Sequence, residues 1–177
     1  MLKNDLLVVF CYAETMSAYL LILETTPMQA GKSYPALPLH CTLVHWFWAE
    51  LEPQDLEKRL QRGLMPSPAQ RFLLDEEAVF TGQTKKGPVP VIVSKVVGTP
   101  SLAVLHARAC KLLDAVGAEY SAPQYVKGGF NPHITHQSGA KLKKGESLLS
   151  KAVYLISAEA PEYGNPRYIV AKFKLAD

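Results

Sequence analysis

The sequence of 177 residues has few of the features that mark secreted, membrane-bound or metal-binding proteins. Its three cysteines, Cys11, Cys41 and Cys110, are widely spaced in apolar sequence and fit neither a disulfide framework nor a metal-ligand pair. No apolar run approaches the roughly 18 residues of a membrane span. The short run at residues 6–10 lacks the length and the cleavage site of a signal peptide. These absences predict buried thiols in a reducing compartment, a cytoplasmic location and no membrane contact.

An excess of charge of one sign is also missing. The net charge is +3, and the fractions of charged residues (20%) and hydrophobic residues (48%) are ordinary for a globular protein. Such a mildly basic chain is compatible with an anionic substrate but is not typical of a protein that coats nucleic acid. The length predicts one domain over residues 1–177 that buries a core, and we expect a monomer.

Strand-like and helix-like segments alternate along the chain. The predicted strands are Leu6–Tyr12, Ala18–Leu23, Leu39–Phe47, Arg71–Phe80, Val89–Val97, His133–Gln137, Ser150–Glu159 and Arg167–Leu175. Leucines at helical spacing predict one helix over Glu52–Leu64, and a second is predicted over Leu102–Val116 with Ser101 as its N-cap. Each half of the chain contributes sheet and one long helix, which indicates a bilobal α+β domain.

The most informative pattern is His-x-Thr, which occurs at residues 40–42 and again at residues 133–135, each time inside a predicted strand. Because side chains two positions apart on a strand share a face, each copy places an imidazole beside a hydroxyl. Two such pairs, brought together across a cleft, would supply two proton-transfer groups and two hydroxyl donors around one small anion. Phosphodiester chemistry without a metal needs these groups.

The residues around the two motifs sharpen this interpretation. Leu-Pro-Leu-His-Cys-Thr-Leu at 37–43 and Phe-Asn-Pro-His-Ile-Thr at 130–135 resemble the signature strands of the 2H phosphoesterases. That superfamily includes the LigT-like RNA 2′,3′-cyclic phosphodiesterases, also called 2′-5′ RNA ligases. The resemblance implies a bilobal α+β fold in which two antiparallel sheets face a central cleft, with helices on the outside. It also implies that His40 and His133 form an acid–base pair and that Thr42 and Thr135 hold phosphate oxygens.

Four further side chains are candidates for substrate contact. Trp46 has the strand parity of the first motif, so its ring is able to line the cleft and stack on a base; packing between the lobes is the competing expectation. Tyr125 precedes the second motif, and Arg167 begins the last predicted strand. Many family members carry a basic residue soon after the second motif. Here the first one is Lys141, in a turn that is otherwise expected to be solvated.

Two further histidines lie near the motifs in the sequence. His45 and His136 lie an odd number of positions from the motif histidines, so strict alternation places them on the opposite face. No cluster has zinc-ligand spacing, and we expect neither a metal nor a cofactor.

With the resemblance, the sequence predicts an enzyme, a metal-independent phosphodiesterase. Its expected substrates are 2′,3′-cyclic phosphates of nucleotides or RNA ends, which it would hydrolyse to phosphomonoesters. Two alternatives stay open. The same groups would suit 2′-5′ oligoadenylates, cyclic oligonucleotides or ADP-ribose cyclic phosphate, and a non-catalytic module would bind nucleotides or RNA ends without turnover. The sequence assigns neither the acid and base roles of the histidines, nor the regiochemistry of ring opening, nor ligase activity.

Overall fold

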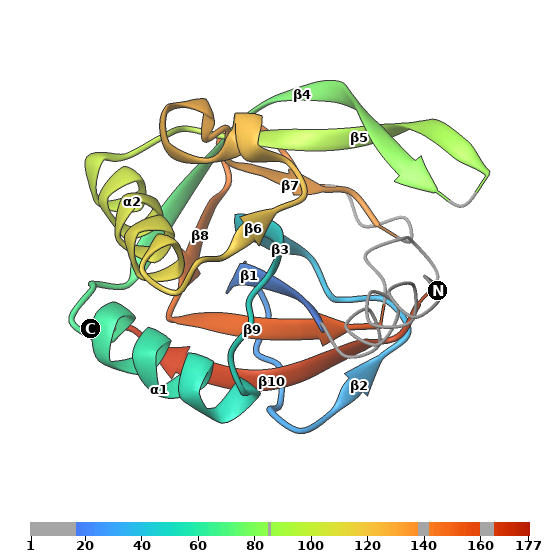
Figure 1. Ribbon diagram of the computed structural model, residues 1–177. Helices are drawn as coiled ribbons and strands as arrows, with labels where there is room; N and C mark the ends of the chain where they lie inside the picture. The colour runs from blue at the N-terminus through green and yellow to red at the C-terminus, as the bar shows by residue number, and fades with distance from the viewer. Residues whose placement is uncertain (1–16, 85, 138–141, 160–164) are drawn as a thin grey trace, which may run out of the picture.

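The computed structural model describes residues 17–84, 86–137, 142–159 and 165–177. Within them, two α-helices pack against antiparallel strands, and the predicted α+β class is confirmed (Figure 1). The strands are β1 (Ala18–Glu24), β2 (Ser33–Tyr34), β3 (His40–Trp48), β4 (Gln70–Thr84), β5 (Gly87–Val96), β6 (Glu119–Tyr120), β7 (His133–Thr135), β8 (Ser147–Ser150), β9 (Ala152–Ala158) and β10 (Arg167–Lys174). The helices are α1 (Pro53–Leu64) and α2 (Pro100–Asp114), with 3-10 turns η1 (Pro123–Tyr125) and η2 (Lys127–Gly129). The predicted strand Leu6–Tyr12 lies outside the described residues.

The strands form a single curled sheet in the order β2-β10-β9-β1-β3-β7-β5-β4-β8, with β6 attached to β3. We call β2-β10-β9-β1-β3 the first half and β7-β5-β4-β8 the second half. The resemblance implied two antiparallel sheets that face a cleft. In the structure the two halves are also joined edge to edge, because β3 and β7 pair antiparallel. The strands that carry the two motifs are therefore neighbours in one sheet.

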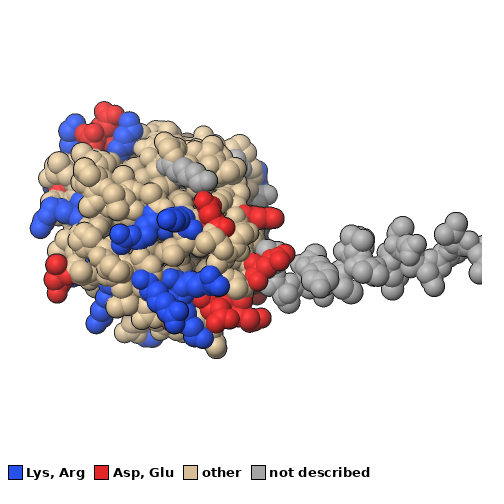
Figure 2. Space-filling view, turned by 60° about the vertical axis from the view of Figure 1, so that its left-hand side comes forward, with Lys and Arg blue, Asp and Glu red and all other residues tan. Residues whose placement is uncertain are grey.

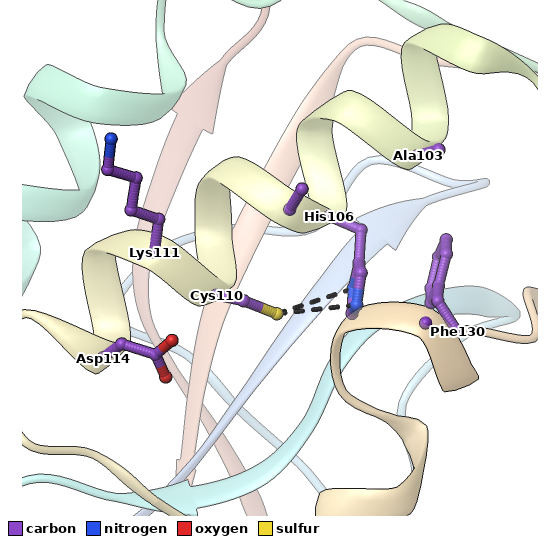
Figure 3. Close-up of a pocket in the computed structure, with 8 residues that line it drawn as sticks. Ala103, His106, Cys110, Lys111, Asp114 and Phe130 are labelled. Carbon is purple, nitrogen blue, oxygen red and sulfur yellow. Dashed lines mark hydrogen bonds between the residues drawn. The ribbon is translucent and has the colours of Figure 1, made fainter.

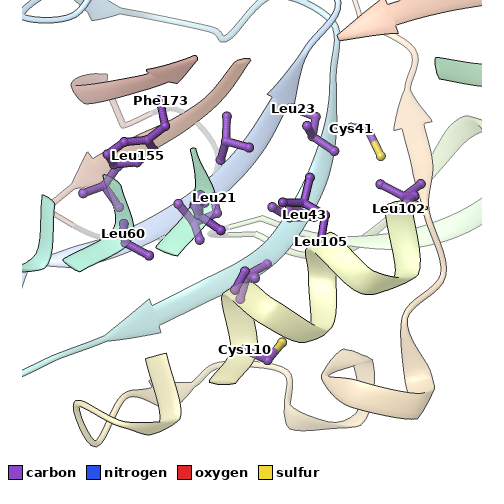
Figure 4. Close-up of a cluster of buried hydrophobic side chains, with 14 of the residues drawn as sticks. Leu21, Leu23, Cys41, Leu43, Leu60, Leu102, Leu105, Cys110, Leu155 and Phe173 are labelled. Atoms are coloured by element: carbon purple, nitrogen blue, oxygen red, sulfur yellow. The ribbon is translucent and has the colours of Figure 1, made fainter. Parts of the chain in front are cut away.

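Both helices cover the same face of the sheet and enclose the main core (Figure 4). Leu56, Leu60 and Leu64 lie four residues apart on α1, and all three are buried. They pack with buried residues of α2 and of the sheet, among them Leu105 and Phe173. Neither of these helices lies on the opposite face of the sheet, which we call the helix-free face with reference to the described residues.

Several boundaries differ from the sequence-based prediction for local reasons. Thr99, not Ser101, is the N-cap of α2, because its Oγ1 accepts a hydrogen bond from the Leu102 amide at 3.2 Å and Pro100 occupies the first turn. The Ser101 hydroxyl instead donates to Gln70 Oε1 at 2.9 Å. Strands β2 and β6, of two residues each, were not predicted, since runs so short carry no periodicity.

The surface has no single charged field on the side seen in Figure 2. Lys and Arg gather there in separate patches, and Asp and Glu lie mainly near the edges. None of the helices in the described part of the chain is long and apolar enough to cross a membrane.

Candidate active site

Strand β3 presents the first motif on the face away from the helices. In the pairing of β3 with β1, His40 lies opposite Glu24 and Thr42 lies opposite Ile22. Ile22 belongs to a smaller apolar cluster on the helix-free face, whereas Cys41, which is 0% exposed, belongs to the main core. Directly opposite residues share a face, so the His40 and Thr42 side chains both point away from the helices.

Strand β7 aligns the second motif with the first. Cys41 of β3 lies opposite Ile134 of β7. Because one step forward on a strand is one step back on its antiparallel partner, His40 lies opposite Thr135 and Thr42 opposite His133. Directly opposite Cβ atoms are about 4.5–5.5 Å apart, and diagonal ones about 7–8 Å.

This register gathers the four side chains into one small group. Two imidazoles lie on one diagonal of the group and two hydroxyls lie on the other. From this spacing we expect one phosphate to reach all four side chains.

Each motif histidine is oriented by its own backbone. The Nδ1 atom of His40 lies 2.7 Å from the Pro38 carbonyl oxygen, and that of His133 lies 2.8 Å from the Asn131 carbonyl oxygen. A carbonyl oxygen only accepts, so Nδ1 carries the proton in both rings and donates it. In the neutral form, Nε2 is then the basic nitrogen of each ring. Among the described residues, no protein group forms a hydrogen bond with either Nε2.

The electrostatic environment keeps both rings neutral near pH 7. Burial lowers the pKa of His40 below 6.5, and the nearby charges of His133 and Arg167 lower it further against the opposing effect of the Pro38 carbonyl. Burial also lowers the pKa of His133, while the Asn131 carbonyl opposes the shift. A bound anion would act in the opposite direction by favouring the imidazolium form.

Arg167 and Trp46 lie together at the first-half side of the site. The Arg167 guanidinium stands 4.7 Å from the centroid of the Trp46 ring, and the two residues are only 8% and 7% exposed. The charge of Arg167 contributes to the lowered pKa of His40, as a smaller cause than burial and the charge of His133. Trp46 does lie on the helix-free face of the sheet, as its parity indicated, but Arg167 covers one side of its ring.

A buried carboxylate lies beside His40, and other groups compensate it. Glu24, opposite His40, accepts a hydrogen bond from the Tyr154 hydroxyl at 2.8 Å and pairs with Lys172 at 3.4 Å. Its negative charge is therefore balanced within the first half.

Two side chains near His133 were missed by the sequence analysis. Lys95 of β5 lies directly opposite His133, and its Nζ donates to Glu76 Oε1 at 2.8 Å. The Phe80 ring of β4 meets the His133 ring edge to face, with 4.8 Å between centroids and an interplanar angle of 67°. Both come from β-strands whose pairing with the motif strand brings them there, and no motif in the sequence marked either residue.

The other predicted residues lie in different surroundings. Tyr125 is 54% exposed on η1, and no contact joins it to a motif side chain within the part of the chain described here. Lys141 lies outside the described residues. From the same turn, Lys144 pairs with Asp75 at 3.0 Å. The contact roles of Tyr125 and Lys141 stay predictions.

Strict alternation fails beyond Thr42. The pairing of β1 with β3 shifts register twice, so Leu43 and Val44 both face the main core. His45 donates to or accepts from Ser121 Oγ at 2.8 Å, and its pKa is lowered by burial and then by the charge of His133. His45 is exposed, in agreement with the surface position expected for it. His136 does lie on the other face, where its Nε2 is 2.7 Å from Ser94 Oγ.

His106 of α2 connects the helix to both motif segments from behind the sheet. Its Nδ1 donates to the Leu43 carbonyl oxygen at 2.7 Å, and its ring stacks on Phe130 with 4.0 Å between centroids. A groove of about 560 Å³ runs along this side, where His106, Cys110 and Phe130 meet (Figure 3). None of the four motif side chains lines it, so this groove is separate from the candidate site.

Neither a reactive thiol nor a cluster of metal ligands accompanies the motifs in the described residues. Burial raises the pKa of the Cys41 thiol to about 12, which keeps it protonated and unreactive. Three or more His, Cys, Asp or Glu side chains grouped as metal ligands do not occur within the described ranges.

Comparison with known proteins identifies the family. The model of the 2′-5′ RNA ligase superfamily matches residues 24–162, and this chain belongs to that superfamily of 2H phosphoesterases. No curated protein matches the sequence.

Solved structures share the fold. E. coli LigT in complex with 3′-AMP is 16% identical, with a TM-score of 0.59, and the match covers 92% of this chain and 100% of LigT. A structure described as a phosphoesterase is 14% identical with a TM-score of 0.54, over 92% and 100% of the two chains. The protein TT0787 of Thermus thermophilus is 17% identical with a TM-score of 0.50, over 90% and 97%. At these identities the likeness establishes the LigT-like fold.

Proposed function

We propose that this protein is a metal-independent phosphodiesterase that opens 2′,3′-cyclic phosphates of nucleotides or RNA ends to phosphomonoesters. The observation that carries this proposal is the register of β3 and β7, which sets each motif histidine opposite the threonine of the other motif. The arrangement offers two free Nε2 atoms and two hydroxyls to one phosphate. Membership of the 2′-5′ RNA ligase superfamily supports the same class of chemistry.

The reaction needs two proton transfers. Water attacks phosphorus, a P–O bond to water forms, and the P–O bond to one ribose oxygen breaks. One neutral imidazole accepts the water proton at Nε2, and the other, as imidazolium, donates its Nε2 proton to the departing ribose oxygen. Each transfer contributes on the order of 10²–10⁴ in rate.

The substrate itself provides the protonated partner. Both histidines are neutral in the free protein near pH 7, because burial lowers their pKa values. An anionic phosphate between them raises the pKa of the imidazole it contacts, so the imidazolium forms on binding. Thr42 and Thr135 donate hydrogen bonds to the non-bridging oxygens, where negative charge accumulates. Two cations lie close to the histidines. The charge of Arg167 contributes to the lowered pKa of His40, and Lys95 lies opposite His133 in the pairing of β5 with β7.

The nucleotide nature of the substrate rests on the relatives. LigT has been crystallised with 3′-AMP and with NADP⁺. A phosphomonoester of a nucleoside, such as 3′-AMP, is the kind of product that opening of a 2′,3′-cyclic phosphate yields.

A product-resolved assay tests the proposal. The purified chain is incubated with 2′,3′-cyclic nucleotides, 2′-5′-linked dinucleotides and cyclic dinucleotides, with and without EDTA. We expect ring opening of the first class in the presence of EDTA and none by the double variant His40→Gln/His133→Gln, whose fold is checked by circular dichroism. Complete loss of turnover in EDTA would contradict the metal-independent mechanism.

Two other outcomes replace the proposal with one of its alternatives. The family name favours 2′-5′ linkages as the second candidate substrate, and turnover of the 2′-5′ dinucleotide without ring opening would establish it. Tight binding of cyclic nucleotides without any product would indicate a binding module.

A further inference from the structure

We propose that the β4–β5 hairpin provides the nucleobase-binding wall of this site, with Phe80 as the residue that contacts the base. This inference rests on the proposed function and adds to it the position of the base relative to the two histidines. We call the four residues Ala78, Phe80, Val91 and Val93 the inner face of the hairpin.

Strand register puts the inner face on the same side of the sheet as the motifs. Val93 lies opposite Thr135 in the pairing of β5 with β7, so Val93 shares the face of the second motif. In the pairing of β4 with β5, Ala78 lies opposite Val93 and Phe80 opposite Val91. The inner face is therefore a continuation of the catalytic face, away from the first half.

Phe80 is in direct contact with the catalytic group. Its ring meets the His133 ring at 4.8 Å between centroids. The Nδ1 edge of His133 is turned toward the Asn131 carbonyl, so Nε2 remains for the phosphate. A nucleoside attached to that phosphate has the Phe80 ring immediately beside it.

The chemistry of the inner face selects a flat apolar group. All four residues are apolar, and Phe80 is half-buried, so part of its ring remains open. Every base has a π-face that stacks on an aromatic side chain. On the same side of β5, Lys95 follows Val93, lies opposite His133 and pairs with Glu76, so the apolar inner face ends there.

The first half also carries aromatic residues on this face, because Trp46, Trp48 and Tyr34 belong to its apolar cluster or pack against it. Trp46 is 7% exposed and lies under the Arg167 guanidinium. The Phe80 ring, in contrast, contacts a motif histidine directly. Figure 1 shows the β4–β5 hairpin projecting beyond the rest of the sheet, which gives this wall its length.

The test compares two substrates that share a cyclic phosphate and differ in the base. We measure kcat/KM for a 2′,3′-cyclic nucleotide and for glycerol 1,2-cyclic phosphate, which has no base, and take their ratio. Loss of one base–aromatic stack in Phe80→Ala is expected to lower this ratio by about 5-fold to 150-fold. Phe80→Trp keeps a π-face and is expected to retain the ratio.

The matched control is Val79→Ala, one residue away on the same strand. Val79 is 69% exposed and points to the opposite face of the hairpin, so its truncation is expected to change neither rate constant. An equal fall of both rate constants in Phe80→Ala would overturn the proposal, because it would mean that Phe80 acts only through the orientation of His133. An unchanged ratio would overturn it as well.

The outcome is separable from a failure of the proposed function. If the wild-type chain turns over neither substrate, the function fails, and the wall is then tested by binding. Titration with a nucleoside 3′-monophosphate and with inorganic phosphate should show a selective loss of affinity for the nucleotide in Phe80→Ala. Equal affinities of Phe80→Ala and the wild type for the nucleotide would reject the wall.

Discussion

The two motif strands each hold one imidazole and one hydroxyl, but in very different frameworks. Strand β3 has nine residues and pairs along much of its length with β1, deep in the sheet. Strand β7 has three residues, follows two 3-10 turns, and is held between β3 and β5. Two backbone hydrogen bonds extend the pairing of β7 with β5 beyond the ends of β7. The Val96 amide donates to the Pro132 carbonyl oxygen, and the His136 amide donates to the Ile92 carbonyl oxygen.

This contrast indicates that a short strand is sufficient to position His133 when other strands pair with it on both sides. His40 depends on the long strand in which it lies. His133 depends on β3 and β5 on either side of β7, on the turn before it, and on the stack of Phe130 against His106. The second motif should accordingly be the more sensitive of the two to distant substitutions.

The largest expected effect comes from the histidines themselves. Each of His40→Gln and His133→Gln is expected to lower kcat by about 10²–10⁴-fold, because each removes one proton transfer. The wild-type pH–rate profile should be bell-shaped, and the variant that lacks the base should lose its acidic limb while the other loses its alkaline limb. Measuring both profiles assigns the two roles. Loss of the same limb in both variants would contradict a division of labour.

The threonines should give the next largest effect, and a similar one in both frameworks. Thr42→Val and Thr135→Val keep the shape and the strand propensity but remove a hydroxyl donor. Loss of a hydrogen bond to a charged group costs about 1.5–3 kcal/mol, or roughly 10–150-fold in kcat/KM. Thr81→Val, on an exposed position of β4, is the control and should change kcat/KM less than about twofold. A wild-type rate for either motif variant would remove that threonine from the mechanism.

A substitution at Gly129 should distort the turn that precedes β7 and leave β3 unaffected. A Cβ at Gly129 would overlap the backbone carbonyl oxygen of Gln124, so Gly129→Ala forces the turn before β7 to shift. We expect a loss of about 1–3 kcal/mol in the free energy of unfolding, measured by urea titration, together with reduced turnover. Gly128→Ala meets nothing within 4 Å and should stay within about 0.5 kcal/mol. Equal stability of the two variants would show that the turn is not constrained.

The smallest effect concerns stability against pH. The pKa values of His40 and His133 lie below 6.5 in the folded protein, mainly because of burial. Between those values and 6.5 the unfolded chain binds more protons, so the free energy of unfolding falls as the pH drops through this window. Urea titrations from pH 8 to pH 5 should show this slope, and His40→Gln/His133→Gln should reduce it. A double variant with the same slope as the wild type would assign the acid sensitivity elsewhere.

The sequence was sufficient to predict the motifs but not their neighbours. Spacing of two residues on a strand is a local property, so the shared face of His40 and Thr42 followed from alternation alone. The direct opposition of His40 and Thr135 did not, because it depends on the register between two strands that are far apart in the chain. Phe80 and Lys95 were missed for the same reason.

Alternation also failed where the strand was irregular. Two register shifts in the pairing of β1 with β3 lie between Thr42 and Phe47, and nothing in the residues of that segment marks them. The burial of both Leu43 and Val44 in the main core therefore did not follow from alternation. Element types were predicted well where periodicity was long, as in both α-helices and most of the long strands, whereas the short strands β2, β6 and β8 were not predicted.

The pairing of β3 with β7 joins the two halves of the sheet, so the proposed active site lies on the seam between them. Any spreading of one half from the other would separate the two imidazoles and would also open the main core, which contains residues of both halves. We therefore expect loosening of this pairing to abolish the proposed catalysis. Hydrogen exchange of the Cys41 and Ile134 amides would report on the integrity of the catalytic centre without any substrate present.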